Sequence, residues 1–368
     1  MRVTEKGFNS INDNTAVLPN TGIKIYRADD TNAKYEGNVE IDNEFNESPI
    51  KEGTYTYYFG QTSKASEKYF NPLEGKYIKI VAKVNGDGRV ALLNSGNEDN
   101  GYFEVYTGDA SQIHASDKKV TDNEILKNIH VGVSIVNNVS TIKVVVENPI
   151  QYELDINSVD TSNNFLKGVK FTVTRGKEEL FEEQSLFENY ATEDVEITES
   201  PRDPDTYTYY ITQNSKPIKN GSELDRYINV LENKVLKLTV SANTDGTLDI
   251  SKIQVLEKSN YGYTVLDENY FTDYLADYII PKIVNNDDTN KMSRIQVTVK
   301  SPVRFIMEVT KTNTEETQKP LGDTEIEINS SIIDNQNHKY DNKEISGIDS
   351  IDNNGTIKGK TTNDSEGT

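Results

Sequence analysis

The 368-residue sequence has no cysteine and no tryptophan, and it has only three histidines. Without cysteine the chain can form neither a disulfide nor a thiolate metal site, so a covalent link between strands needs other chemistry. The histidines, His114, His130 and His338, stand in unrelated contexts, and no pattern predicts a catalytic triad, a metal site or a phosphate loop. We therefore expect no enzymatic activity, no cofactor and no bound metal. A carboxylate pair for glycoside hydrolysis stays open among the 60 acidic residues, but a solvated acidic surface explains them more simply.

Long apolar runs and positive charge are also scarce. No stretch approaches the ~20 apolar residues of a membrane-spanning helix, and residues 1–7 lack the apolar core of a signal peptide. A formal net charge of −21 argues against binding to nucleic acid or to an anionic membrane surface, because both carry charge of the same sign. The chain is then either intracellular or an internal piece of a longer protein. We favour the second interpretation, because the repeat pattern stops partway through a copy at the C-terminus.

Two nearly identical stretches, residues 54–64 and 206–216, lie 152 residues apart (206 − 54). Each alternates threonine with tyrosine, and this period-2 pattern predicts a strand with one exposed face. Residues 140–149 and 293–302 also match, at an offset of 153. A strand pattern that recurs at one long period indicates copies of one domain. We therefore expect two complete domains and the start of a third, at 1–149, 150–302 and 303–368.

Turn-forming and helical segments interrupt the strands. Residues 85–88 (Asn-Gly-Asp-Gly) and 243–246 (Asn-Thr-Asp-Gly) occupy matching places between strands and predict hairpin tips. Calcium binding by these loops is the alternative, but the ligand ladder of an EF-hand is missing. Residues 267–280 place aromatic and apolar residues at i, i+4 spacing and predict a helix of three to four turns before Pro281, with 121–129 as a weaker counterpart. We expect its aromatic stripe to pack on a sheet, and a sugar-stacking platform is the alternative.

The order of elements in the second copy resembles a known domain. Residues 152–160 (Tyr-x-Leu-x-Ile-x-Ser-Val-Asp), 165–171 (Phe-Leu-Lys-Gly-Val-Lys-Phe), 205–213 (Asp-Thr-Tyr-Thr-Tyr-Tyr-Ile-Thr-Gln) and a last strand ending at Pro302 are similar to the CnaB/SpaA-type prealbumin-like domain. That domain occurs in tandem in Gram-positive surface proteins, adhesins and pilins. The resemblance implies an all-β fold of tandem Greek-key-like β-sandwich domains, prealbumin-like or Ig-like, with one short helical insertion each. The many short strands are independently compatible with it.

Domains of this family often contain an isopeptide bond, in which a first-strand lysine attacks a last-strand asparagine with the help of a buried acid. By the resemblance, the lysine position falls on Ser10 and Ser158, the acid on Gln61 and Gln213, and the asparagine on Asn148 and Ser301. Serine and glutamine cannot perform this chemistry. We therefore predict no isopeptide bond in either copy, with ordinary hydrogen bonds of about 1 kcal/mol each in its place. Lys311 occupies the lysine position of the incomplete third copy, and its partners would lie beyond Thr368.

Residues 18–22, Leu-Pro-Asn-Thr-Gly, spell the recognition pattern of sortases. A working signal is followed by an apolar segment and a basic tail at the C-terminus. This one precedes a predicted strand near the N-terminus, so we interpret the match as a coincidence.

These patterns predict a non-enzymatic structural repeat of an extracellular bacterial surface protein, such as a stalk, an adhesin or a pilus or appendage subunit. Its signal and anchor would lie outside this fragment. The expected partners are neighbouring copies of the repeat, and also the protein itself in a filament or a ligand on a host surface. The alternatives are a glycan- or host-protein-binding module with tyrosine contacts, and a fibre subunit that assembles by strand exchange. We expect no nucleic-acid partner and no membrane insertion by this segment.

Overall fold

The structure is a computed structural model whose described part is residues 2–303, without 8–17, 19, 31, 40–42, 48–49, 94–101, 178–179, 192–193, 220–221, 260–261 and 286–290, and with three later strands. The chain forms two compact units, Met1–Pro302 and Val303–Thr368. In the second unit, the described strands β23 (Glu325–Ile328), β24 (Ile348–Ile351) and β25 (Ile357–Lys360) form a sheet in the order β23-β25-β24. Within the first unit, we call residues 1–149 the first repeat and 150–302 the second repeat.

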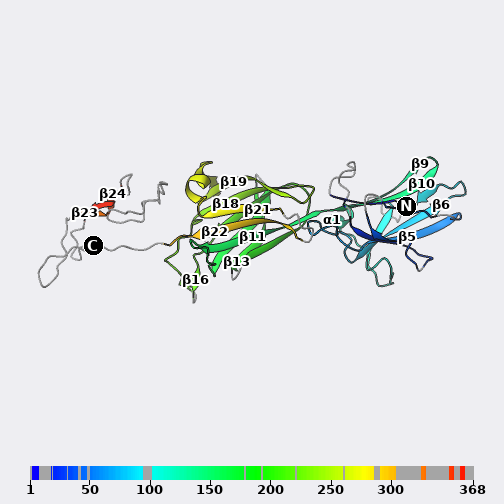
Figure 1. The fold of residues 1–368 in the computed structure, drawn as a ribbon, viewed down its shortest axis with the longest axis horizontal. Helices are drawn as coiled ribbons and strands as arrows, with labels where there is room; N and C mark the ends of the chain where they lie inside the picture. The colour runs from blue at the N-terminus through cyan, green and yellow to red at the C-terminus, as the bar shows by residue number, and fades with distance from the viewer. Residues whose placement is uncertain are drawn as a thin grey trace. The chain divides into compact units, whose positions relative to one another are not determined.

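The first repeat has two sheets and one turn of helix (Figure 1). One sheet, in the order β4-β1-β10-β9, contains β1 (Arg2–Gly7), β4 (Asn43–Glu44), β9 (Ile129–Val136) and β10 (Val139–Asn148). The other, in the order β3-β2-β5-β6-β7 with β8 also paired to β6, contains β2 (Gly22–Arg27), β3 (Tyr35–Asn38), β5 (Gly53–Gln61), β6 (Lys76–Val84), β7 (Val90–Leu92) and β8 (Phe103–Thr107). Helix α1 (Asn123–Leu126) begins where the carboxylate of Asp122 accepts a hydrogen bond from the Glu124 amide.

The second repeat has the same plan. Its first sheet, in the order β14-β11-β22-β21, contains β11 (Ile150–Asp160), β14 (Val195–Arg202), β21 (Ile279–Val284) and β22 (Ser293–Ser301). Its second sheet, in the order β13-β12-β15-β18-β19-β20, contains β12 (Val169–Lys177), β13 (Leu180–Ala191), β15 (Thr206–Gln213), β18 (Lys234–Ala242), β19 (Leu248–Ser259) and β20 (Gly262–Val265). A small hairpin joins β16 (Ile218–Lys219) to β17 (Ser222–Glu223).

In both repeats the first and last strands lie side by side and parallel, β1 with β10 and β11 with β22. A parallel pair needs a long connection between its strands, and here the rest of each repeat supplies it. The prediction of an all-β fold is confirmed. The division into 1–149, 150–302 and 303–368 remains our proposal, and this duplicated topology is the observation in its favour.

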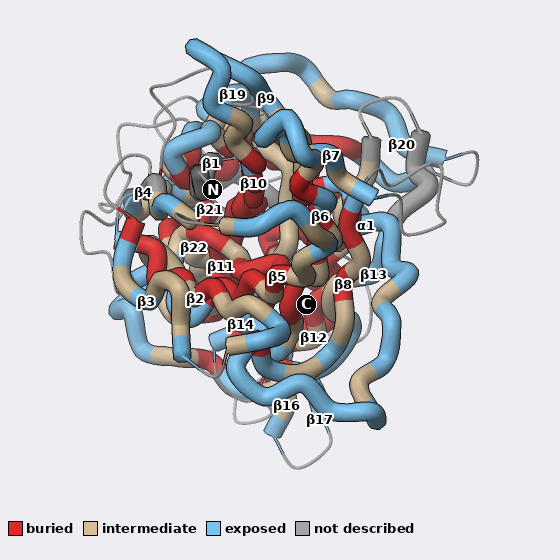
Figure 2. Tube along the Cα trace, turned by 90° about the vertical axis from the view of Figure 1, so that its right-hand side faces the viewer, coloured by how far each residue is buried: buried red, intermediate tan, exposed pale blue. Residues whose placement is uncertain are grey.

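Each repeat has its own core between its two sheets. In β22 buried and half-buried residues alternate strictly, as expected for a strand with one face on the core. Strand β11 is more fully buried, although both β11 and β22 are interior strands of the sheet. Figure 2 shows the buried positions on the sheet strands and the exposed ones along peripheral segments such as β16 and β17. Full burial of a side chain such as Phe59 or Leu154 stabilises the fold by about 1.5–3 kcal/mol.

The predicted hairpin tips are confirmed, whereas the predicted long helix is wrong. Residues 85–88 join β6 to β7, and 243–246 join β18 to β19, with glycine at positive φ in both. In the region 267–280, the structure has only the five-residue π-helix η2 (Phe271–Leu275), followed by β21. Pro281 lies inside β21, the edge strand of its sheet, where a missing amide hydrogen is tolerated. Cross-strand pairing to β22 thus overrides the helical spacing, while Leu275 still packs in the core as expected.

The two repeats meet in a packed junction at Pro149. The Phe70 amide donates to the Pro149 carbonyl at 2.7 Å, and the Gln151 amide donates to the Lys68 carbonyl at 2.8 Å. Tyr69, between them, is buried in the core of the second repeat. The loop before β6 therefore holds the start of β11 by backbone hydrogen bonds and by an inserted aromatic ring.

Candidate functional site

The predicted acid and asparagine positions of the first repeat meet in its interior. Gln61 ends β5 in one sheet, and Asn148 ends β10 in the other. Both side chains are buried, and Gln61 Nε2 donates a hydrogen bond of 2.9 Å to Asn148 Oδ1. This bond joins the two sheets where the family resemblance puts two members of a cross-link. Two amides include no nucleophile, so the contact is a hydrogen bond that contributes about 1 kcal/mol.

Strand register shows which residue of β1 corresponds to Ser158 of β11. Ser10 lies outside the described residues. Glu5 is opposite Val146 in the β1–β10 pair, and Ser158 is opposite Val299 in the β11–β22 pair. The two valines are 153 residues apart (299 − 146), which is the repeat offset. The assignment of Ser10 thus stays a prediction, and the register favours Glu5 as the counterpart of Ser158.

The three positions of the second repeat also lie inside the protein. Ser158 and Ser301 are fully buried and share one face of their sheet, because Ser158 is opposite Val299 and Ser301 is two residues further along. Gln213 ends β15 in the other sheet, and its Nε2 donates to the Ser215 carbonyl at 3.0 Å. Within the part of the chain that the structure describes, Ser158 Oγ, Gln213 Oε1 and Ser301 Oγ have no hydrogen-bond partner.

Side-chain length explains the difference between the repeats. Asn148 carries its amide one carbon further out than Ser301 carries its hydroxyl, and only the longer side chain meets the glutamine across the sandwich. Each buried polar group left unpaired costs about 1–3 kcal/mol. At the positions that correspond to the lysine, the sequence has Glu5 and Ser158, and at those that correspond to the acid it has Gln61 and Gln213. No lysine is among these four residues. The absence of an isopeptide bond stays a prediction, and Lys311 lies outside the described residues.

The second repeat holds a further buried polar cluster, which the sequence patterns did not indicate. The hydroxyls of Tyr152 and Tyr209 lie 2.6 Å apart, and burial raises the pKa of both side chains. Glu199 is also buried and pairs with Arg175 and Arg202. The buried carboxylate is paired with two arginines and the hydroxyls pair with each other, so we assign this cluster to the structure of the core.

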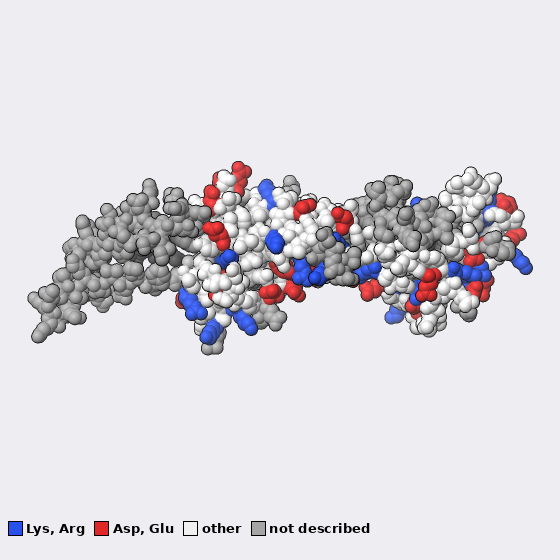
Figure 3. Space-filling view, in the orientation of Figure 1, with Lys and Arg blue, Asp and Glu red and all other residues white. Residues whose placement is uncertain are grey.

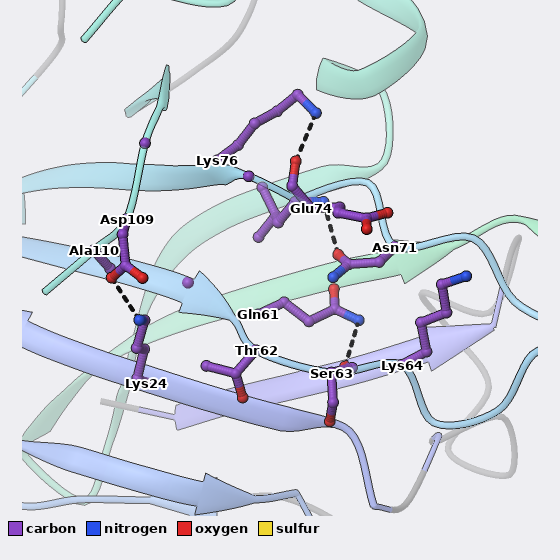
Figure 4. A pocket seen from close by; sticks show the side chains of 14 residues that line it. Lys24, Gln61, Thr62, Ser63, Lys64, Asn71, Glu74, Lys76, Asp109 and Ala110 are labelled. Atoms are coloured by element: carbon purple, nitrogen blue, oxygen red, sulfur yellow. Dashed lines mark hydrogen bonds and ion pairs between the residues drawn. The ribbon is translucent and has the colours of Figure 1, made fainter. Parts of the chain in front are cut away.

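A polar cleft of about 380 Å³, which we call cleft 1, opens beside Gln61 (Figure 4). Its walls come mainly from residues 61–64 (Gln-Thr-Ser-Lys) after β5 and 71–76 (Asn-Pro-Leu-Glu-Gly-Lys), which lead into β6. Figure 4 shows the Lys24–Asp109 pair at one end, Lys64 at the other, and Glu74 and Lys76 between them along the rim. Lys24 Nζ lies 2.5 Å from Asp109 Oδ1.

Local hydrogen bonds fix the walls of cleft 1. Asn71 Oδ1 accepts from the Leu73 amide at 2.8 Å, and Ser63 Oγ accepts from the Gly22 amide at 2.9 Å. Lys76 Nζ donates to a backbone carbonyl at 3.0 Å. Gln61 Oε1 is buried and has no partner among the described residues. The cleft is thus a built feature with a buried amide beside charged rim residues.

The second repeat has a matching cleft of about 490 Å³, which we call cleft 2. Its walls come mainly from residues 213–216 (Gln-Asn-Ser-Lys) and 229–234 (Asn-Val-Leu-Glu-Asn-Lys). The local contacts recur: Leu231 N to Asn229 Oδ1 at 3.0 Å, Lys170 N to Ser215 Oγ at 2.8 Å, and Lys234 Nζ to the Glu232 carbonyl at 3.3 Å. The signal was present in the sequence, because Gln-x-Ser-Lys and Asn-x-Leu-Glu-x-Lys occur in both copies.

The sortase-like segment is part of the fold. Thr21 is fully buried, its hydroxyl donates to the Leu18 carbonyl at 3.2 Å, and Gly22 begins β2. A transpeptidase must reach the Thr21–Gly22 bond to cleave it, and this bond is enclosed by the first repeat. Its burial supports our interpretation of the match as a coincidence.

Charged groups on the visible face of the first unit are mixed in sign. Figure 3 shows Lys and Arg side chains interspersed with Asp and Glu side chains over the described residues. No cluster of three or more His, Asp or Glu side chains in the described ranges is arranged to hold a metal ion. Among those same residues, no helix has the length and apolar character needed to cross a membrane.

Comparisons with known proteins found no matching family model and no matching curated protein. Among solved structures, the chain is similar to the C-terminal fragment of pilus adhesin SpaC from Lactobacillus rhamnosus GG (11% identity, 83% of this chain and 98% of that one, TM-score 0.26). It is also similar to BcpA, the major pilin subunit of Bacillus cereus (12%, 83% and 99%, 0.20), and to the pilus adhesin RrgA from Streptococcus pneumoniae (9%, 54% and 20%, 0.22). These solved structures are pilins and pilus adhesins. At these identities and TM-scores the likeness carries no argument.

Proposed function

We propose that the chain is a non-enzymatic structural repeat region of an extracellular bacterial surface protein, acting as a stalk, an adhesin or an appendage subunit. The observation that carries this proposal is the junction at Pro149. There, β10 leads directly into β11, and the loop containing Tyr69 is bonded to the start of β11 on the far side of the proline. A short junction stiffened by proline and by packing couples two sandwiches into a semi-rigid pair. Such coupling suits a protein that holds another part away from a surface.

The proposal also predicts how each repeat responds to a pulling force. The first and last strands are adjacent, so a pull on the two ends is resisted by the hydrogen bonds between them. In the absence of a covalent link these bonds yield, and the repeat unfolds. The second repeat contains 153 residues (302 − 150 + 1), which span about 500–550 Å when extended.

Single-molecule stretching of the chain tests this statement. We expect a length gain equal to this extended length of about 500–550 Å minus the distance between the two ends of the folded repeat. A repeat that bears load without this gain would contain a covalent lock and would contradict the proposal.

Electron microscopy of the purified chain tests the stalk itself. Single extended particles support the proposal. Regular filaments would replace it with a self-assembling fibre subunit, and compact globules would replace it with a binding module.

A further inference from the structure

We propose that each repeat binds an acidic saccharide in its polar cleft, so that one chain carries two equivalent sites. This inference goes beyond the structural role, and it rests on the agreement between cleft 1 and cleft 2. Eleven lining positions of cleft 1 (Lys24, 60–64, 71 and 73–76) have counterparts that line cleft 2 (Thr172, 212–216, 229 and 231–234). Seven of the eleven pairs are identical, whereas β6 and β18, which follow the clefts directly, share only two of nine residues. The clefts are therefore more alike in sequence than β6 and β18, and their similarity matches that of β5 and β15, which end at the clefts and share five of the seven residues at 54–60 and 206–212.

Four of the seven identical residues have structural roles in the fold. The glutamine donates to a backbone carbonyl, the asparagine accepts from a backbone amide, the serine accepts from the neighbouring strand, and the leucine is buried. The charged rim is Lys64, Glu74 and Lys76 in cleft 1 and Lys216, Glu232 and Lys234 in cleft 2. Lys76 and Lys234 each donate to a nearby backbone carbonyl, but this neutral acceptor does not balance the charge of the ammonium group. Lys64 pairs with Glu67 at 3.2 Å and Lys216 with Asp225 at 3.3 Å, and such exposed pairs contribute only about 0–1 kcal/mol to stability. The repeated charges are therefore better explained by a ligand.

The chemistry of the rim and floor indicates the class of ligand. Cleft 1 is lined by three lysines, a glutamate and an aspartate, and cleft 2 by three lysines and three glutamates. A ligand therefore needs a negative group for the lysines and hydrogen-bond donors for the carboxylates. Gln61 and Gln213 are more than nine-tenths buried, and the Oε1 atom of each lacks a donor among the described residues. A sugar with a carboxylate and several hydroxyls supplies both kinds of group. The cleft volumes, about 380 and 490 Å³, lie in the range of ligand pockets.

An acidic peptide fits these clefts less well. Peptides commonly gain affinity by pairing with an open strand edge. Strands β5 and β15, which end at the clefts, are interior strands flanked by β2 and β6 and by β12 and β18. The identical residues also provide no exposed apolar side chain as an anchor for a peptide.

Calorimetric titration of the full chain with a short oligogalacturonide tests the proposal. We expect two equivalents per chain and weaker binding at higher salt, because the contact is ionic. K64A/K76A should leave one equivalent, K216A/K234A should leave the other, and the fourfold variant should bind about tenfold more weakly or not at all. The matched control K83A/K143A removes two exposed lysines outside the clefts and should bind like the wild type.

Four results would overturn the proposal. They are an absence of binding, a stoichiometry unaffected by the cleft variants, an equal loss of binding in the control variant, and equal binding of a neutral galacto-oligosaccharide of the same length. Tighter binding of a short poly-glutamate peptide at the same two sites would replace the saccharide with an acidic protein segment. Thermal melting of each variant shows whether it is folded, and a variant that is unfolded is replaced by the corresponding lysine-to-glutamine pair.

Discussion

Introducing into the second repeat the three residues of the domain family that the sequence resembles should create a covalent cross-link. The substitutions are S158K, Q213E and S301N, and they fall on positions that are already buried. Ser158 and Ser301 share a face of adjacent strands, so a lysine at the first can reach an asparagine at the second. In the first repeat the equivalent glutamine and asparagine are in contact at 2.9 Å, which indicates that the acid position faces the bond. The introduced lysine nitrogen would attack the introduced amide carbon, and ammonia would leave.

The size of the effect follows from the length of chain that the bond would close. The loop spans 143 residues (301 − 158), and closing it removes conformational entropy from the unfolded chain worth about 5 kcal/mol at 25 °C. For a domain of this size, that corresponds to an increase in Tm of roughly 10–20 °C. Intact mass reports the loss of one ammonia, and calorimetry reports the Tm.

The control keeps Gln213 and carries only S158K and S301N, and it should remain unlinked because no buried acid assists proton transfer. A folded triple variant with unchanged mass would refute the assignment of these positions. If the triple variant does not fold, S301N alone still tests the geometry. It should reproduce the cross-sheet hydrogen bond of the first repeat and stabilise the second by about 1 kcal/mol, and a lower Tm would count against the proposed equivalence.

Three other predictions use different parts of the structure. Replacing either Tyr152 or Tyr209 by phenylalanine leaves the other buried hydroxyl without its partner, and it should lower the free energy of unfolding in urea by about 1–3 kcal/mol. The double variant should lower it by less than the sum of the two single variants. Burial raises the pKa of Asp109, but hydrogen bonds from Lys24 and from a serine outweigh it and hold the pKa at about 2, so K24M should move it toward the ordinary 3.8 in an NMR titration. Burial, with a smaller effect of a nearby carboxylate, raises the pKa of Tyr69 to about 12. Its contribution to stability should therefore be complete below about pH 10 and lost between about pH 10 and 12. Other buried tyrosines lose stability at alkaline pH as well, so Y69F should reduce this loss in pH-dependent unfolding without abolishing it.

The sequence predicted features that depend on local chemistry. The loops at 85–88 and 243–246 contain glycines with positive φ. Such a turn can be predicted from its residues alone, without knowledge of which strands pair. The helix at 267–280 failed because aromatic spacing cannot report that Ile279 and Pro281 pair with β22. Pairing with β22 determines the conformation at the end of this segment, and only the short helix η2 forms within the predicted helical range.

The candidate site was predictable only in part for a related reason. The equivalence of Gln61 and Gln213 was visible from the repeat, but the contact between Gln61 and Asn148 joins two sheets across 87 residues of sequence. The position of the first-strand residue depended on register, which a flexible alignment of short strands cannot fix to within a few residues. The clefts were not predicted because their walls combine a strand end with a loop motif, and the spacing between the two differs between the repeats, from Gln61 to Asn71 in the first and from Gln213 to Asn229 in the second.

The two repeats differ at the positions where the resemblance puts a cross-link, and this difference has a physical consequence. The first repeat keeps Asn148 and uses it in a hydrogen bond between sheets, whereas the second has Ser301 and leaves three buried polar atoms without partners in the described part of the chain. Unpaired polar atoms in a core lower stability, so the second repeat has more to gain than the first from any change that supplies a partner. The junction at Pro149 offsets part of that cost by inserting Tyr69 into the core of the second repeat. The stability of the second repeat thus depends on the first, and deletion of the first repeat should destabilise the second by more than the loss of a flexible neighbour would.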